Sequence, residues 1–195
     1  MVSASPDTDT KPRPARGFVV FKWCVYALLA LDVLLFGLYG RATELLDTAA
    51  WVVLVLLFEW ETGGWGLPAR ARPLLHGVRA LAAIGVVVAV VGYAMEREWL
   101  DFANEATWLG VVALLEVDLR LPSRFKRAHR LRRYAAGALY LALGGFLVTW
   151  LLGGIAGDDP RAAWLDTWDA ALWLVAFWVI ELNVFGWGSK AQDRR

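Results

Sequence analysis

Six apolar segments alternate with short polar connections along the chain. Most approach the roughly 20 residues that a helix needs to cross the hydrocarbon core of a bilayer, where a helix satisfies its own backbone hydrogen bonds. The segments are predicted at about residues 18–39, 48–65, 78–95, 106–121, 134–155 and 170–188. The pattern therefore predicts an all-α integral membrane protein with six transmembrane helices.

Polar segments flank this apolar region at both ends. Residues 1–16 are expected to form a disordered tail and not a cleavable signal, because the apolar segment behind them is too long and lacks a small-residue cleavage site. Residues 17–189 are expected to form one transmembrane domain, and residues 190–195 a second short tail.

One pattern of polar and aromatic residues occurs three times. It consists of Asp or Asn, a Trp four residues later, an apolar stretch, a Glu, and a further polar residue two positions on. The three copies are Asp47-Trp51-Glu59-Glu61, Asn104-Trp108-Glu116-Asp118 and Asp169-Trp173-Glu181-Asn183. We infer three related helical hairpins at about residues 17–66, 74–121 and 130–188, and repeats of this kind usually place a site where they meet.

Composition supports a membrane protein. Hydrophobic residues make up 58% of the chain, which exceeds the roughly 45–50% of soluble domains. Among the 12 Trp, Trp51, Trp108 and Trp173 recur in register and are predicted to pack inside the protein, whereas most others suit an aromatic belt at the membrane interfaces. Cys24 is the only cysteine, so an intrachain disulfide is excluded.

Charge alternates from one connection to the next, although the net charge is only +1. All but three of the 20 Lys and Arg lie in or beside the two tails and the 67–79 and 120–133 connections. The other connections are expected to hold ten acids: Glu44, Asp47, Glu96, Glu98, Asp101, Glu105, Asp158, Asp159, Asp166 and Asp169. By the positive-inside rule, both termini and the basic connections are cytoplasmic, and the bacterial inner membrane is the expected location.

Six acids lie within the predicted spans, where each costs about 2.5–3.5 kcal/mol at a helix centre. They are Asp32, Glu59, Glu61, Glu116, Asp118 and Glu181. We expect Glu59, Glu116 and Glu181 to face inward as a ring that binds a cation, including a metal ion, or relays protons. Glu61, Asp118, Asn183 and Asp32 would support that ring, and no other cofactor is expected.

A structural role for these acids is the alternative. Glu116 and Arg120 have the favourable i, i+4 order for an ion pair on a helix. Glu59 could likewise pair with Arg70, Arg72 or Arg79. The sequence leaves both interpretations open.

A basic segment follows Pro122 and precedes the fifth span. It contains Arg124, Lys126, Arg127, Arg130, Arg132 and Arg133. Lys126 and Arg132 break the single-faced arginine pattern of a voltage-sensing helix. We expect instead a loop or interfacial segment that contacts anionic lipid head groups at the cytoplasmic face.

Catalytic motifs are not evident. The two histidines, His76 and His129, both lie in basic connections, and no nucleophile–base arrangement or phosphate-binding loop stands out. The hypothesis is a transport protein or channel for a small cation, which could be a proton, a monovalent ion or a divalent metal ion. A non-transporting membrane subunit or scaffold, or an enzyme acting on lipid head groups, remains an alternative. A second copy of the chain or other membrane subunits are possible partners, and nucleic acid is not.

Overall fold

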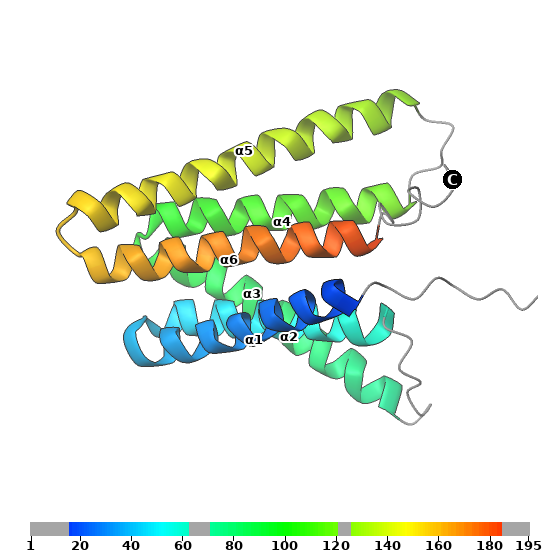
Figure 1. Ribbon diagram of the computed structural model, residues 1–195, viewed down its shortest axis with the longest axis horizontal. Helices are drawn as coiled ribbons and strands as arrows, with labels where there is room; N and C mark the ends of the chain where they lie inside the picture. Colours follow the sequence, from blue (N-terminus) through cyan, green and yellow to red (C-terminus); the bar gives the residue numbers. More distant parts are fainter. Residues whose placement is uncertain (1–15, 63–70, 121–125, 185–195) are drawn as a thin grey trace, which may run out of the picture.

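The computed structural model describes residues 16–62, 71–120 and 126–184, which form six α-helices (Figure 1). The helices are α1 (Arg16–Tyr39), α2 (Ala42–Thr62), α3 (Arg72–Glu96), α4 (Trp99–Arg120), α5 (Lys126–Ala156) and α6 (Pro160–Val184). Three of them contain segments long and apolar enough to cross a membrane: Gly17–Tyr39, Arg72–Glu96 and Arg127–Ala156. The all-helical class predicted from the sequence is thus confirmed, and the three apolar helices support membrane embedding, whereas six membrane spans and their orientation stay a prediction. The two predicted tails, 1–16 and 190–195, fall almost entirely outside the described residues.

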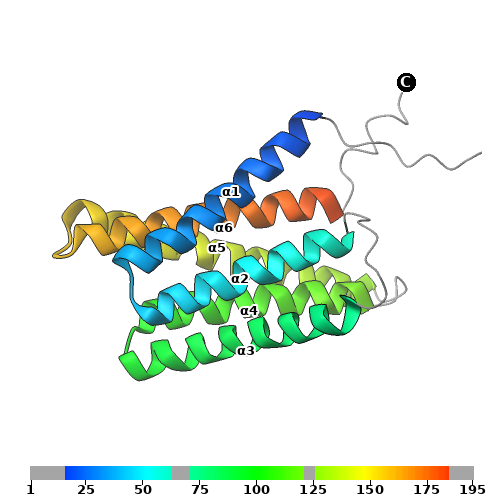
Figure 2. The same ribbon diagram turned by 90° about the horizontal axis from the view of Figure 1, so that it is seen from below.

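Successive helices run in opposite directions and form three hairpins. Residues 40–41, 97–98 and 157–159 connect α1 to α2, α3 to α4 and α5 to α6. These three connections lie at the same end of the bundle in both views (Figures 1 and 2), and we call it the hairpin end. Helices α2, α4 and α6 therefore all begin at the hairpin end, so equivalent positions of the sequence repeat lie at similar depths.

The hairpins close into one bundle around a shared core. Each helix packs against its neighbours in sequence, and α6 also packs against α1. The core is built mainly from residues on α1, α2, α4 and α6, among them Leu29, Val55, Trp108 and Phe177. Large apolar residues on the opposite faces of α1, α3 and α5 are exposed, as expected for surfaces in contact with lipid.

All six helices begin earlier than the apolar pattern predicted, and this corrects the assignment of the acidic residues. Helix α2 begins at Ala42 because Glu44 accepts a hydrogen bond from the backbone N–H of Arg41 at 2.8 Å, which is half of a capping box. Helix α6 begins at Pro160 after the N-cap residue Asp159, whose Oδ1 accepts from the N–H of Ala162 at 3.3 Å.

Most of the acids assigned to connections are consequently helical. Glu98, Asp158 and Asp159 do lie in connections, whereas the helices contain Glu44, Asp47, Glu96, Asp101, Glu105, Asp166 and Asp169. The polar side chains in these segments predict loops, but the helices continue through them. The described part of the basic segment, residues 126–133, likewise forms the first two turns of α5 and is not a loop.

Small residues allow α2 and α3 to approach closely. A Cβ added at Gly92 would lie 2.8 Å from Cγ2 of Thr43, and one at Gly85 would lie 3.2 Å from Cβ of Ala50. Gly77, on the same helix as Gly92, has open space around it. Close contact between small residues is a common way to hold membrane helices together.

We expect Gly92→Val to lower the free energy of unfolding by about 1–3 kcal/mol, because the new side chain cannot fit against Thr43 without moving α2 away from α3. The measurement is thermal unfolding of the purified protein in detergent. Gly77→Val is the matched control and should change stability much less. Equal destabilisation by both variants would show that helix propensity, and not the close approach, sets the effect.

Candidate functional site

The first two positions of the sequence repeat meet inside the bundle, near the hairpin end. Two adjoining cavities of about 20 Å³ and about 30 Å³ lie there, and each is large enough for about one water molecule. Both are lined by Asp47, Thr48, Asn104 and Asp169. We call these two cavities together the acidic pocket. Its lining therefore includes the equivalent residue from each of the three repeats: Asp47 from α2, Asn104 from α4 and Asp169 from α6.

The three repeat tryptophans lie one helical turn deeper than these polar residues. Trp51 and Trp173 pack edge to face with ring centroids 6.3 Å apart, and Trp108 packs on Phe177 at 4.5 Å. We call Trp51, Trp108 and Trp173 the tryptophan layer. All three line the first cavity and also contact the apolar core. The layer therefore separates the acidic pocket from the interior further along the helices.

Four carboxyl groups with buried oxygens surround this region: Asp32 and Glu105 are buried residues, and Asp47 and Asp169 are partly buried residues with one fully buried oxygen each. The Tyr93 hydroxyl donates to Asp47 at 3.0 Å, and the Trp51 indole N–H donates to Glu105 at 2.8 Å. Asp32 on α1 has no exposed surface, and Glu105 is 2% exposed. Several of their oxygens are buried without a hydrogen-bond partner: both of Asp32, Oδ1 of Asp47 and Oδ1 of Asp169.

These four carboxyl groups also lack basic partners. Among the residues that the structure describes, no Lys or Arg forms an ion pair with Asp32, Asp47, Glu105 or Asp169. An ionised carboxylate without a partner is very costly to bury, so such a group normally takes up a proton or binds a cation. The acidic pocket is thus suited to hold positive charge.

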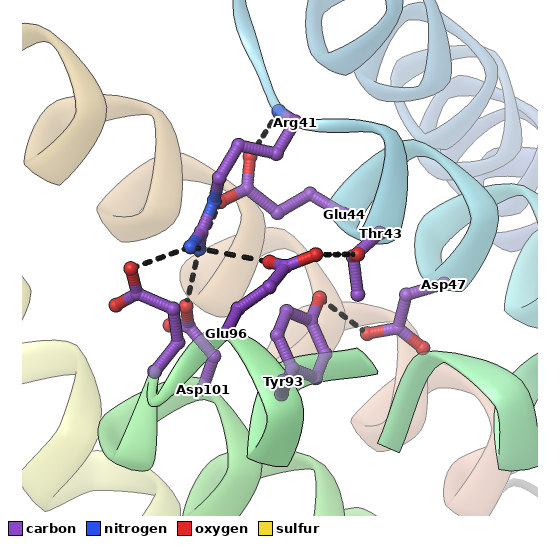
Figure 3. Close-up of polar contacts among 8 residues, drawn as sticks. Arg41, Thr43, Glu44, Asp47, Tyr93, Glu96 and Asp101 are labelled. Atoms are coloured by element: carbon purple, nitrogen blue, oxygen red, sulfur yellow. Dashed lines mark hydrogen bonds and ion pairs between the residues drawn. The ribbon is translucent and has the colours of Figure 1, made fainter. Parts of the chain in front are cut away.

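The side chain of Arg41 lies among four acids at the hairpin end of the pocket, and we call this cluster the rim (Figure 3). The Arg41 guanidinium donates to Glu44 at 2.7 Å and to Asp101 at 2.8 Å, and it lies 2.6 Å from a carboxylate oxygen of Glu98 and 3.5 Å from one of Glu96. Glu44 and Asp101 also line the second cavity. Arg41 therefore connects the first hairpin to the second directly above the pocket.

Two acids, Asp101 in the first turn of α4 and Asp166 in the second turn of α6, have raised pKa values. Burial raises the pKa of Asp101 to about 6, although Arg41 acts in the opposite direction. Burial, and then the nearby carboxylates Asp101 and Glu44, raise the pKa of Asp166 to about 8. Both acids line the second cavity. Protons can therefore exchange near neutral pH at the outer side of the pocket.

The glutamates predicted to form a ring lie further from the hairpin end. Glu59 forms an ion pair with Lys22 and accepts a hydrogen bond from Tyr26 at 2.9 Å. Glu61 forms an ion pair with Arg79 on α3 at 2.7 Å. Glu116 is an exposed residue of α4. The side chains of Asp118, Glu181 and Asn183 lie outside the described part of the structure.

The basic segment is only partly described. Arg127, Arg130 and Arg133 are exposed on α5, and Arg132 is partly buried. Arg124 and the side chain of Lys126 lie outside the described residues. Contact of this segment with anionic lipid stays a prediction.

Sequence reasoning named Asp32 as a supporting residue and did not name Asp47, Glu105 or Asp169 as interior ligands. The sequence repeat could have identified two of them, because Asp47 and Asp169 occupy its first position and a Trp follows each by one helical turn. No group of three His, Cys, Asp or Glu side chains is placed to hold a metal ion within residues 16–62, 71–120 and 126–184.

We expect Arg41→Gln to destabilise the protein by about 1–2 kcal/mol at neutral pH, since exposed ion pairs contribute about 0.2–1 kcal/mol each and several are lost together. Lower pH should restore part of this loss, because protonation relieves the repulsion between the acids left behind. The measurement is thermal unfolding at pH 5 and pH 7.5. Arg130→Gln, an exposed position on α5, is the control and should change little. A loss of stability that is independent of pH would contradict the charge explanation.

We expect Asp166→Asn to flatten the dependence of stability on pH. With a pKa of about 8 in the folded protein and an ordinary value of 3.8, Asp166 keeps its proton longer when folded. Its contribution to stability is complete below about pH 4 and disappears as the pH rises towards about 8. Melting temperatures between pH 4 and pH 8 should thus fall less in this variant than in the wild type. The exposed Asp158→Asn variant should keep the wild-type slope, and equal slopes in all three proteins would contradict the raised pKa.

Comparison of the chain with protein-family models, with curated proteins and with solved structures found no match.

Proposed function

We propose that the protein is a membrane transport protein or channel for a small cation, and that the acidic pocket is its binding site. The observation that carries this proposal is the presence of four carboxyl groups with buried oxygens, Asp32, Asp47, Glu105 and Asp169, without a basic partner among the described residues. Ionisable residues inside a membrane protein commonly mark the path of an ion or a proton.

A comparison within the same molecule supports a functional role for these groups. Elsewhere the chain supplies a cation for its acids: Lys22 for the partly buried Glu59, Arg79 for the exposed Glu61, and Arg41 for the rim. If the pocket acids only held the helices together, a basic partner or apolar replacement would avoid most of the cost of burying them. Their lack of such partners is explained when the missing positive charge is the transported cation.

The proposed route enters at the hairpin end. With both termini and the basic connections on the cytoplasmic side, all six helices would cross the membrane and the hairpin end would face outward. Glu44, Glu96, Glu98 and Asp101 would then raise the local concentration of cations at the entrance. The acidic pocket would receive the cation from this rim.

An inner binding position is the second part of the proposal. Glu59 follows Trp51 by about 12 Å along α2, at about 1.5 Å per residue. Glu116 and Glu181 occupy the same place in the other repeats. Cations that pass the tryptophan layer would next meet these glutamates, and the Lys22–Glu59 ion pair would have to open for Glu59 to take part.

The test is ion flux through the purified protein in liposomes, with protons, Na⁺, K⁺, Mg²⁺ and Ca²⁺ measured separately. We expect selective flux in the wild type and in Asp158→Asn, an exposed acid of the outer connection. Flux should fall to the rate of protein-free liposomes in Asp47→Asn/Glu105→Gln. A Glu59→Gln/Glu116→Gln/Glu181→Gln variant tests the inner position in the same assay.

Two results would count against the proposal. Absence of flux for every cation, with the protein folded and inserted, would reject transport and favour a subunit of a larger membrane assembly. Flux that survives in the pocket variant but not in the glutamate variant would move the binding site to the inner position.

A further inference from the structure

Asp32 on α1 and Asp169 on α6 lie at a similar depth on two helices that pack directly against each other. Arg161 lies over the Tyr39 ring near the hairpin end, and Asp32 is seven residues from Tyr39 whereas Asp169 is eight residues from Arg161. We treat the two acids as a candidate carboxyl pair. Asp32 is completely buried, and neither of its oxygens has a hydrogen-bond donor in the described structure. Oδ1 of Asp169 is also buried without a donor. With both groups ionised, neither can donate to the other.

The binding of a single proton would let one of the two carboxyl groups donate a hydrogen bond to the other. Two carboxylates that share a buried site cannot both stay ionised, because each disfavours the charge of the other. When one is protonated, its O–H can donate a hydrogen bond to a carboxylate oxygen of the other. Pairs of aspartates that share one proton are a recurrent solution in enzyme active sites.

The charged groups around the pair also favour the binding of a proton. The charged groups that act on the pair from neighbouring positions are Asp47 on α2 and Asp166 on α6, and both carry the same sign as the pair. No described Lys or Arg forms an ion pair with Asp32 or Asp169. Both surrounding acids therefore favour proton uptake by the pair.

The pair is also connected to the outer side of the protein. Asp169 lines both cavities of the acidic pocket, and Asp101 and Asp166 line the second cavity below the rim. Each cavity has room for about one water molecule. A short chain of carboxyl groups and water can thus carry protons between the rim and Asp169, with Asp32 behind it.

We propose that Asp32 and Asp169 are a proton-binding pair and that the cation moved through the acidic pocket is the proton. This inference rests on the proposed transport function and names its substrate. Uptake forms one O–H bond, so that two carboxylates become one carboxylate and one carboxylic acid. Release breaks that bond and returns the proton to water, without any other reactant.

Two measurements test this proposal on the full chain. Infrared spectroscopy of the protein in lipid at pH 7 reports the C=O stretch of a protonated carboxylic acid. A pH-sensitive dye inside liposomes reports collapse of an imposed proton gradient, and Na⁺ and K⁺ flux are followed in parallel. The variants are Asp32→Asn and Asp169→Asn, which keep the side-chain shape, with exposed Asp158→Asn as the matched control. Helical circular dichroism and a single gel-filtration peak verify folding.

We expect a buried carboxylic acid band in the wild type and in Asp158→Asn, and proton flux in both. In both Asp32→Asn and Asp169→Asn, proton flux should fall to the rate of protein-free liposomes, and the band should weaken or shift. The band should not vanish, because Asp166, with a pKa of about 8, also holds a proton at pH 7. Asp166→Asn removes that contribution, so a band that persists in Asp166→Asn tests protonation of the pair even if an Asp32 or Asp169 variant fails to fold.

The contrary outcomes separate this inference from the proposed function. Na⁺ or K⁺ flux without proton flux, or proton flux that is unchanged in both Asn variants, would overturn the proton assignment and leave cation transport standing. Absence of a protonated carboxyl band in the wild type would overturn the proton-binding pair. Absence of flux for every ion would overturn both proposals together.

Discussion

The burial of carboxyl groups without basic partners is the constraint on which the functional organisation of this protein depends. Asp32, Asp47, Glu105 and Asp169 lie inside a bundle whose outer faces are apolar, and the two small cavities beside them each have room for about one water molecule. Transfer of one ionised carboxylate to such a place costs several kcal/mol even after relaxation of the protein. The hydrogen bonds from Tyr93 and Trp51 offset only part of that cost. The rest of the cost is avoided when the carboxyl groups bind a proton or another cation, and this determines what the pocket can bind.

The helical hairpins explain how four such groups come together. Because α2, α4 and α6 all begin at the hairpin end, the first repeat position of each lies at a similar depth and the following Trp lies one turn below. Capping by Glu44 and Asp159 extends α2 and α6 beyond their apolar segments. That extension converts residues of an expected outer loop into residues of the interior. The arginine at the rim then connects two hairpins at the level where the carboxyl groups converge.

Much of this fold follows from the sequence, because hydrophobic segments and hairpin connections are local features. Helical class, membrane embedding and an interior position for Asp32 could be reasoned from apolar lengths and from one acid within an apolar span. The Lys22–Glu59 ion pair could not be predicted from the sequence, because those residues are 37 positions apart and only the packing of α1 on α2 brings them together. Asp169 was assigned to a connection because the apolar count begins after it, whereas its helix begins at Pro160. Repeats predict which residues are equivalent, and long-range packing decides which of them meet.

The two halves of the repeat differ in charge compensation, and this difference has a mechanistic consequence. Glu59 and Glu61 have Lys22 and Arg79 as counterions, whereas Asp47 and Asp169 have none among the described residues. In the proposed transport, a cation arriving from the hairpin end would therefore bind most favourably above the tryptophan layer. Beyond that layer it would have to compete with Lys22 for Glu59. Passage in either direction then requires movement of Trp51, Trp108 or Trp173, or entry of water between them, because their rings are packed against the core. The tryptophan layer is consequently the part of the structure where a transport cycle would be controlled.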